Sequence, residues 1–273
     1  MDIGKAVILG IVQGLTEFLP VSSSGHLVLG KHFLGLQEQG IEFEVFVHFG
    51  TLLAVLTIFR KEIFNLIMAF FKLFSPKVFS AGLDNYYRKS LDFRLLVYII
   101  IATIPAAVIG LTFEDKIETA FHSPRFACSM LIITAVILFL TLFAKKGTAP
   151  LSLRNTLIIG IAQACAILPG ISRSGSTISA GLYQNISGKE AARFSFLLAI
   201  PAILGATMIK AIEISVSGIG SDMLMVLAAG MIAAYVSGFV AIESLIAIVG
   251  RGKLYWFAPY CLIIGVLGLI FIK

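Results

Sequence analysis

The sequence predicts an all-α integral membrane protein built as an inverted repeat, with one re-entrant helical hairpin and three transmembrane helices in each half. Three observations lead to this prediction: the composition, the number of long apolar runs, and a motif that recurs later in the chain. Hydrophobic residues make up 58% of the 273 positions and charged residues 13%, whereas about a quarter of the residues in a soluble domain are charged. The composition therefore favours a single membrane domain over a soluble protein.

Six apolar runs are close to the length of about 20 residues that a membrane-spanning helix needs. They lie at about 43–60, 95–113, 126–144, 191–213, 223–249 and 254–272. Two further stretches, 6–34 and 154–186, are apolar at both ends and polar in the middle, and each is broken by a proline followed by a Ser/Gly cluster. We expect six full spans and two re-entrant hairpins.

The two broken stretches match each other when the chain is shifted by 150 residues. Five residues of the first stretch recur in the same order and at the same spacing in the second: Gly10, Gln13, Ser22, Ser24 and Gly25 recur as Gly160, Gln163, Ser172, Ser174 and Gly175. Pro20 and Pro169 are one position out of phase. The match divides the single domain, 1–273, into repeat one at 1–148 and repeat two at 149–273. Because three spans follow each hairpin, the second copy is upside down, and such repeats commonly place a site near the membrane midplane.

The net charge of +6 is explained by membrane topology, and we expect no nucleic-acid partner. Basic residues gather in 60–94 and 145–154, which should be cytoplasmic, while 114–125 and 215–222 have few or none. This distribution of basic residues agrees with hairpins that enter and leave the membrane on the same side. It puts both termini outside, with the first hairpin entering from outside and the second from the cytoplasm.

The polar centres of the hairpins predict an anion site. Non-helical backbone cannot face lipid, so it must line an enclosed or wet cavity. Half-helices starting near Ser22 to Ser24, and near Ser172 to Ser174, would turn free N–H groups toward the membrane centre. We expect Ser22, Ser24 and Gly25, with their twins Ser172, Ser174 and Gly175, to bind phosphate there. Arg173 lies in the second cluster, and its planar guanidinium suits phosphate oxygens. The alternative is a structural ion pair between Arg173 and Glu17.

Two residue pairs in the first hairpin indicate chemistry. Gln13 and Glu17 share a helical face, and their oxygens favour a hard divalent cation such as Mg²⁺ or Ca²⁺ beside the phosphate. Glu17 could instead carry protons or simply pair with Arg173. Ser23 and His26 lie within one helical turn, the spacing of a nucleophile and its general base. His48 lacks such neighbours in the sequence, and we interpret it as a loop, interface or packing histidine.

From the residues alone, an enzyme and a secondary transporter or lipid flippase are nearly balanced, because inverted repeats with midplane hairpins also occur in transporters. A channel is the third alternative, although no ring of repeated carbonyl-lining sequence is visible. The Ser23–His26 pair favours an enzyme, since transport needs no nucleophile.

The motifs "QGLTEFLPVSSSGH" (13–26) and "PGISRSGSTIS" (169–179) resemble the undecaprenyl-diphosphate phosphatase family, the bacitracin-resistance membrane proteins of bacteria. The segments "FEVFVHFGTLLAV" (43–55), "IPAAVIGL" (104–111) and "FSFLLAIPAILGA" (194–206) also look like parts of this family. The resemblance implies a hydrolase acting on a phosphoric anhydride: it would convert undecaprenyl diphosphate to undecaprenyl phosphate and inorganic phosphate, recycling the lipid carrier of cell-wall synthesis. It also implies location in the bacterial cytoplasmic membrane, a polyprenyl diphosphate substrate and contact with membrane lipid. A homodimer is left open.

The resemblance also suggests roles for the site residues. Gln13 and Glu17 match a Glu/Gln-x-x-x-Glu metal motif, Ser23 a nucleophile and His26 a proposed base. Four residues of the second hairpin match a phosphate-binding cluster: Ser172, Arg173, Ser174 and Thr177. The first position of the metal motif is glutamine here, which puts direct metal contact by residue 13 in doubt.

Overall fold

The computed structural model describes residues 2–33, 41–145, 147–217 and 221–272, and within these ranges the regular structure is helical. The α-helices are α1 (Ile3–Phe18), α2 (Ser23–Phe33), α3 (Ile41–Ile58), α4 (Arg60–Lys72), α5 (Pro76–Ala81), α6 (Leu83–Lys89), α7 (Leu91–Thr112), α8 (Glu114–Phe121), α9 (Pro124–Leu140), α10 (Leu153–Cys165), α11 (Arg173–Tyr183), α12 (Gly188–Ser217), α13 (Ser221–Gly250) and α14 (Ala258–Phe271). Short 3₁₀ helices, η1 (Thr141–Phe143) and η2 (Leu254–Phe257), follow α9 and precede α14.

The helices confirm a multi-pass membrane protein. Among the described residues, five helical stretches are long and apolar enough to cross a membrane. They belong to α7, α9, α12, α13 and α14 and correspond to five of the predicted spans. The sixth prediction, 43–60, falls on α3, which passes the same test only together with α4, and the two helices meet at an angle of 83°. Within the described residues, the candidate spans therefore number five, or six if this bent pair counts as one.

Each of the two broken stretches forms two helices separated by a short irregular segment. Proline disfavours helical backbone in the residue before it, and Leu19, before Pro20, is extended with ψ of 146°. The first break ends at Ser22, which has a positive φ of 70°. The second break contains Gly170, with φ of 96°. Residues 19–22 form the first break and 166–172 the second, so the two breaks differ in length.

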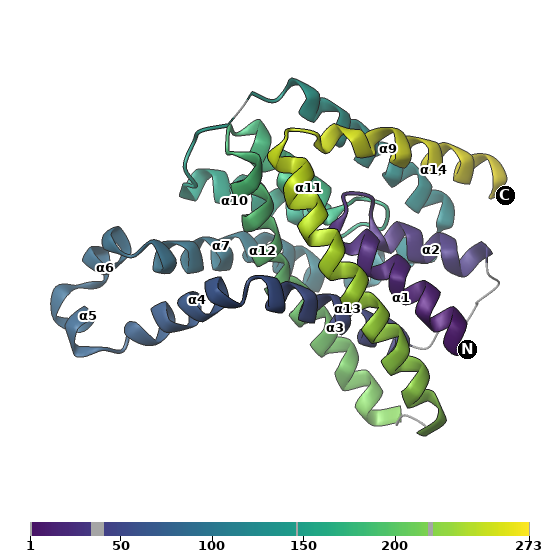
Figure 1. Ribbon diagram of the computed structural model, residues 1–273, viewed down its shortest axis with the longest axis horizontal. Helices are drawn as coiled ribbons and strands as arrows, with labels where there is room; N and C mark the ends of the chain where they lie inside the picture. Colours follow the sequence, from purple (N-terminus) through teal and green to yellow (C-terminus); the bar gives the residue numbers. More distant parts are fainter. Residues whose placement is uncertain (1, 34–40, 146, 218–220, 273) are drawn as a thin grey trace.

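The long helices pack in a related way in the two halves of the chain. In Figure 1, α1 runs along α13, and α10 lies against α7. The remaining large contacts join α9 to α14 and α3 to both α12 and α13. The first helix of each broken stretch is thus held by a long helix from the other half.

Small residues bring α1 and α13 into backbone contact. A Cβ added to Gly14 would lie 2.0 Å from Oγ of Ser237 and 2.4 Å from the carbonyl oxygen of Ala234. At α10 and α7, a Cβ on Gly160 would lie 2.6 Å from the carbonyl oxygen of Ala102. Both contacts leave no room for a side chain on the glycine.

Replacing Gly14 by alanine is therefore expected to destabilise the protein. Overpacking of a close contact costs about 1–3 kcal/mol, so the thermal unfolding midpoint of the detergent-purified protein should fall. Gly205→Ala is the matched control, because a Cβ at this helical glycine of α12 meets nothing within 4 Å. An equal midpoint for the two variants would contradict the close approach of α1 to α13.

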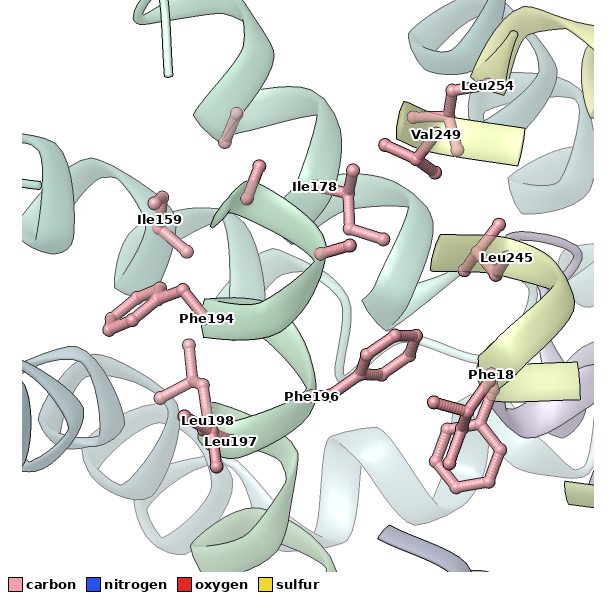
Figure 2. Close-up of a cluster of buried hydrophobic side chains, with 14 of the residues drawn as sticks. Phe18, Ile159, Ile178, Phe194, Phe196, Leu197, Leu198, Leu245, Val249 and Leu254 are labelled. Atoms are coloured by element: carbon pink, nitrogen blue, oxygen red, sulfur yellow. The ribbon is translucent and has the colours of Figure 1, made fainter. Parts of the chain in front are cut away.

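The main apolar core brings together side chains from several helices of both halves of the chain. Figure 2 shows Phe18 from α1 and Phe196 from α12, with side chains from α10, α11 and α13 around them. The Phe18 and Phe196 rings meet edge to face, with centroids 5.8 Å apart. Because Phe18 is fully buried and follows Glu17 directly, this core fixes the end of α1 that carries Glu17.

The segment 60–94, which the sequence suggested only as a basic cytoplasmic region, contains three helices. The segment α4–α6, with the first part of α7, extends away from the rest of the molecule (Figure 1, left). Large apolar side chains are exposed along it, among them Phe64, Phe71, Phe74 and Phe79.

Candidate active site

The two broken segments touch each other. A Cβ on Gly25, at the start of α2, would lie 3.1 Å from Cα of Gly170 in the second break. Ser174, at the start of α11, donates a hydrogen bond from Oγ to the carbonyl oxygen of Leu19 in the first break, at 3.2 Å. The starts of α2 and α11 are therefore neighbours, although they are about 150 residues apart in the sequence.

Side chains from α9 and α14 satisfy polar backbone groups in the breaks. Thr134 of α9 donates from Oγ1 to the carbonyl oxygen of Gly170 at 2.8 Å and accepts from the N–H of Ser172 at 3.0 Å. Cys261 of α14 donates from Sγ to the carbonyl oxygen of Pro20 at 3.6 Å. Because unpaired backbone groups are costly inside a membrane, these contacts stabilise the irregular segments.

Glu17 joins the two segments chemically. Its Oε1 accepts a hydrogen bond from a terminal guanidinium nitrogen of Arg173 at 2.5 Å. Its Oε2 accepts a hydrogen bond from Oγ of Ser23 at 2.6 Å. Ser23 and Arg173 thus contact opposite oxygens of one carboxylate, and the Glu17–Arg173 ion pair that was the alternative interpretation is formed.

Two more side chains approach the same carboxylate. Gln13 donates from Nε2 to Oε2 of Glu17 at 3.0 Å, and Nε2 of His48 lies 4.0 Å from Oε2. The Glu17 side chain is 7% exposed and that of Arg173 is 16% exposed. A buried carboxylate is stable only when it is paired and hydrogen-bonded, and Glu17 meets that condition in full.

The expected hydrogen bond between Ser23 and His26 is replaced by other contacts. Nδ1 of His26 lies 2.8 Å from the carbonyl oxygen of Ser22, and Nε2 lies 2.7 Å from the hydroxyl of Tyr260 on α14. The hydroxyl of Ser23 is directed to Glu17 instead. Both ring nitrogens of His26 are therefore engaged, and the carboxylate of Glu17 is the group positioned to take a proton from Ser23.

Several residues expected to bind phosphate use their hydroxyls within the protein. Ser22 accepts from the N–H of Gly25 at 3.2 Å, and Ser172 accepts from that of Gly175 at 3.1 Å. Ser24 pairs with Ser22, while Ser174 pairs with Ser172 and with Leu19. Thr177 donates to the carbonyl oxygen of Arg173 and pairs with Ser195 of α12 at 2.6 Å. These residues shape the starts of α2 and α11, and Ser23 and Arg173 carry the side chains directed at Glu17.

The residues also fit a bound divalent cation. Oε1 of Gln13 is buried and has no hydrogen-bond partner, while its Nε2 contacts the Glu17 carboxylate. An unpaired oxygen beside a carboxylate is the kind of donor that Mg²⁺ and Ca²⁺ prefer. Within the described part of the chain, no group of three or more His, Cys, Asp or Glu side chains could hold a metal. A cation here would therefore take most of its ligands from phosphate and water.

Sequence reasoning missed three residues of this region. His48, interpreted as a loop, interface or packing histidine, approaches Glu17. Tyr260 contacts His26, and Thr134 contacts the second break. No spacing signal connects them to the motifs, because they lie on α3, α14 and α9. The hydroxyl of Thr134 and the ring of His48, each in an apolar helix, were the available hints.

The chain is similar in sequence to known proteins over most of its length. A sequence model of a family described as bacitracin resistance protein BacA matches residues 6–267. The chain belongs to the BacA family. Proteins named undecaprenyl-diphosphatase are similar to this BacA-family chain over nearly its whole length. That of Salinibacter ruber is 44% identical and that of Syntrophotalea carbinolica 44% identical, each covering 97% of both chains. That of Desulforapulum autotrophicum is 40% identical over 99% of this chain and 98% of its own.

Proposed function

We propose that this protein hydrolyses undecaprenyl diphosphate to undecaprenyl phosphate and inorganic phosphate, and so recycles the lipid carrier of cell-wall synthesis. The observation that carries the proposal is the contact of Ser23 and Arg173 with one buried carboxylate, in a chain of the BacA family. A nucleophile and a guanidinium within reach of one small anion are the groups that phosphoryl transfer needs.

In the mechanism that we propose, Oγ of Ser23 attacks the terminal phosphorus, and its proton passes to Oε2 of Glu17. The bond between that phosphorus and the bridging oxygen breaks, so that undecaprenyl phosphate leaves. Once protonated, Glu17 no longer holds Arg173 by charge, and the guanidinium can stabilise the phosphoryl oxygens. Water then hydrolyses the phosphoserine and releases inorganic phosphate. Direct attack by water, without a phosphoserine, is the competing route.

The family resemblance implies that His26 is a base, and we keep this as a proposal. To act on Ser23, the ring of His26 must exchange its contact with Tyr260 or with the Ser22 carbonyl. Single-turnover measurements with His26→Ala test this role: the rate of phosphoserine formation should fall if His26 takes the proton of Ser23. An unchanged rate would leave Glu17 as the base.

The proposed cofactor is a divalent cation, Mg²⁺ or Ca²⁺. Gln13, and Glu17 before it takes the proton of Ser23, would hold it, together with oxygens of the substrate. When bound, the cation would neutralise charge on the diphosphate. Ser22, Ser24, Gly25, Ser172, Ser174, Gly175 and Thr177 are proposed to support phosphate binding by shaping the N-terminal ends of α2 and α11.

Gln13→Glu is expected to increase the affinity of the site for the divalent cation. A second carboxylate beside Glu17 adds ligand charge, and ligand charge tunes cation affinity. The Mg²⁺ concentration for half-maximal phosphate release by chelator-treated protein should fall about ten-fold, and Gln13→Leu should raise it. Gln163→Glu, at the matching position of the second hairpin, is the control, because Ile167 stands where a Glu17 counterpart would be. Identical Mg²⁺ curves for wild type and both Gln13 variants would contradict a cation site at this position.

We further propose the inverted repeat, with two re-entrant hairpins and six spans, in one domain of 1–273 in the bacterial inner membrane. In each half, the first helix of the broken stretch packs on a long helix of the other half: α1 on α13, and α10 on α7. This reciprocal packing supports two halves, 1–148 and 149–273, related by an axis. The contact between Gly25 and Gly170 supports hairpins that meet inside the membrane. Labelling single cysteines introduced at 114–125 and at 60–94 from one side tests the orientation. A homodimer stays a prediction.

Phosphate release tests the proposed function. Purified protein supplied with undecaprenyl diphosphate and Mg²⁺ should release inorganic phosphate, and sealed vesicles with quenching on one side would locate the opening. A secondary transporter or flippase, the alternative, would exchange polyprenyl phosphate across the vesicle membrane without phosphate release. That result would overturn the hydrolase.

A further inference from the structure

Tyr260 connects α14 to the first hairpin. Its hydroxyl lies 2.7 Å from Nε2 of His26, and the two rings are stacked with an interplanar angle of 5°. The next residue, Cys261, donates from Sγ to the carbonyl oxygen of Pro20. Two consecutive residues of α14 thus contact the hairpin on either side of Ser22.

The contacts of His26 determine which of its ring nitrogens carries the hydrogen. Nδ1 lies 2.8 Å from the carbonyl oxygen of Ser22, and a carbonyl oxygen only accepts, so Nδ1 is the donor. In the neutral imidazole, Nε2 then presents its lone pair, and the hydroxyl of Tyr260 donates to it at 2.7 Å. A neutral ring therefore satisfies both contacts, without a second proton.

Ser22 has an unusual backbone conformation and directly precedes the proposed nucleophile. Its φ of 70° lies in the left-handed region, which residues other than glycine seldom adopt and which persists only when the surroundings hold it. Its carbonyl oxygen accepts from the backbone N–H of His26 at 3.1 Å and from Nδ1 of the same residue. Its Oγ accepts from the N–H of Gly25 at 3.2 Å. The His26 ring is thus one of the donors that hold Ser22.

The conformation of Ser22 affects where the hydroxyl of Ser23 lies. Ser23 is the first residue of α2, and its Oγ donates to Oε2 of Glu17 at 2.6 Å. If the carbonyl of Ser22 rotated, the backbone nitrogen of Ser23 would turn with it, because both belong to one planar peptide group. A hydroxyl that must reach both Glu17 and a phosphorus atom tolerates little displacement.

The helix that carries Tyr260 is fixed against α9. A Cβ at Gly265 would lie 2.8 Å from the carbonyl oxygen of Cys128, and a Cβ at Gly268 would lie 2.3 Å from Sγ of the same cysteine. Packing this close leaves α14 little freedom to move relative to α9. The hydroxyl of Tyr260 is therefore a firmly placed donor for the ring on α2.

We propose that Tyr260 is a positioning residue. By donating to Nε2, it holds His26 as the tautomer with hydrogen on Nδ1, and this N–H keeps Ser22, and with it Ser23, in place. The proposal rests on the proposed phosphatase function and extends it. The role that it gives His26 uses the N–H of the ring, and experiment can separate this role from that of a base.

The first test removes only the hydroxyl of Tyr260. Tyr260→Phe keeps the stacked ring, and we expect kcat for phosphate release to fall about five-fold, the scale of one neutral hydrogen bond, with KM little changed. Tyr183→Phe is the matched control and should behave as wild type. The hydroxyl of Tyr183 also donates one hydrogen bond, to the carbonyl oxygen of Ile137, and its exposed fraction of 47% is close to the 43% of Tyr260. Wild-type kcat for Tyr260→Phe, or an equal loss for both variants, would overturn the proposal.

The second test separates positioning from proton transfer. His26→Asn keeps an N–H donor at the place of Nδ1 and has no basic nitrogen, whereas His26→Ala lacks both. His26→Asn should therefore release phosphate at least about five-fold faster than His26→Ala. In the His26→Asn background, Tyr260→Phe should cause less than about a two-fold further loss. Equal rates for the Asn and Ala variants, or multiplying losses in the Asn background, would refute the positioning role.

The third measurement does not depend on activity. Nitrogen-15 NMR of purified protein with labelled histidine should show His26, identified by the signals that His26→Asn lacks, with its hydrogen on Nδ1. In Tyr260→Phe, part of the population should carry the hydrogen on Nε2 instead. Hydrogen on Nε2 in wild type, or an unchanged tautomer in the variant, would contradict the proposal. If wild type shows the expected tautomer and releases no phosphate, the proposed function fails instead, so the two failures are distinguishable.

Discussion

Arg173→Ala is expected to reduce phosphate release by about a thousand-fold or more, the scale seen when an arginine that stabilises a transferring phosphoryl group is removed. The guanidinium is the charged donor held nearest to Ser23, through the shared carboxylate of Glu17. Arg173→Lys should recover only a small part of the activity, since an ammonium lacks the planar fork that matches phosphate oxygens. The measurement is kcat/KM for undecaprenyl diphosphate with purified variants.

The same change should affect stability, and this effect must be separated from catalysis. Removing one partner of a buried ion pair costs about 3–5 kcal/mol, because the other charge stays buried. The Arg173→Ala protein should therefore unfold at a lower temperature. The double variant Glu17→Gln with Arg173→Met carries neither charge, so its unfolding temperature should return most of the way to that of wild type while it stays inactive. Arg193→Ala is the control: its ion pairs with Glu62 and Glu190 are longer and more exposed, so little change is expected. Activity of Arg173→Ala near the wild-type level would contradict the proposed role.

The apolar spans could be predicted from the sequence because a bilayer imposes a length and a composition on each helix. The runs at 95–113 and 126–144 correspond to α7 and α9 with ends shifted by a few residues. The helices of 60–94 could not be predicted in the same way. Arg60 and Lys61 begin α4 and Lys72 ends it, so the apolar stretch between them is too short to be recognised as a span.

The meeting of Ser23 and Arg173 at Glu17 could be expected from the matched hairpins, since both half-helices begin at the same point of the repeated motif. The hydrogen-bond partners of Ser23 and His26 could not be predicted from the motifs. Ser23 and His26 are spaced for contact on one helix, but Ser23 is the first residue of α2 and lies against the end of α1. Its hydroxyl therefore meets Glu17, while the ring of His26 bonds to the carbonyl oxygen of Ser22, four residues earlier.

His48 illustrates a different limit of sequence reasoning. A histidine on an apolar helix gives no indication of which neighbour it will face, because that depends on how α3 packs against α1 and α13. The close approach at Gly50 sets this packing, and it results from the tertiary arrangement. Residues that approach a site from separate helices are for this reason harder to predict than residues within one motif.

Ser23→Ala should distinguish the two chemical routes by the size of its effect. If Oγ of Ser23 attacks phosphorus, its removal should lower kcat by at least about a thousand-fold, as with other serine nucleophiles. If water attacks directly, the variant loses only a hydrogen bond to Glu17. A hydrogen bond to a charged group is worth about 1.5–3 kcal/mol, which corresponds to a loss of about ten- to 150-fold. The measurement is single-turnover phosphate release.

Ser24→Ala is the matched control, since the hydroxyl of Ser24, the residue after Ser23, pairs with that of Ser22 and not with Glu17. It should retain activity within about ten-fold of wild type, because a neutral hydrogen bond contributes about 1 kcal/mol. Substrate labelled in the terminal phosphate should leave acid-stable label on quenched wild-type protein and none on Ser23→Ala. A modest loss for Ser23→Ala, without label on wild type, would rule out the phosphoserine. Glu17 would then orient the attacking water, and its contacts with Arg173 and Gln13 would serve that step.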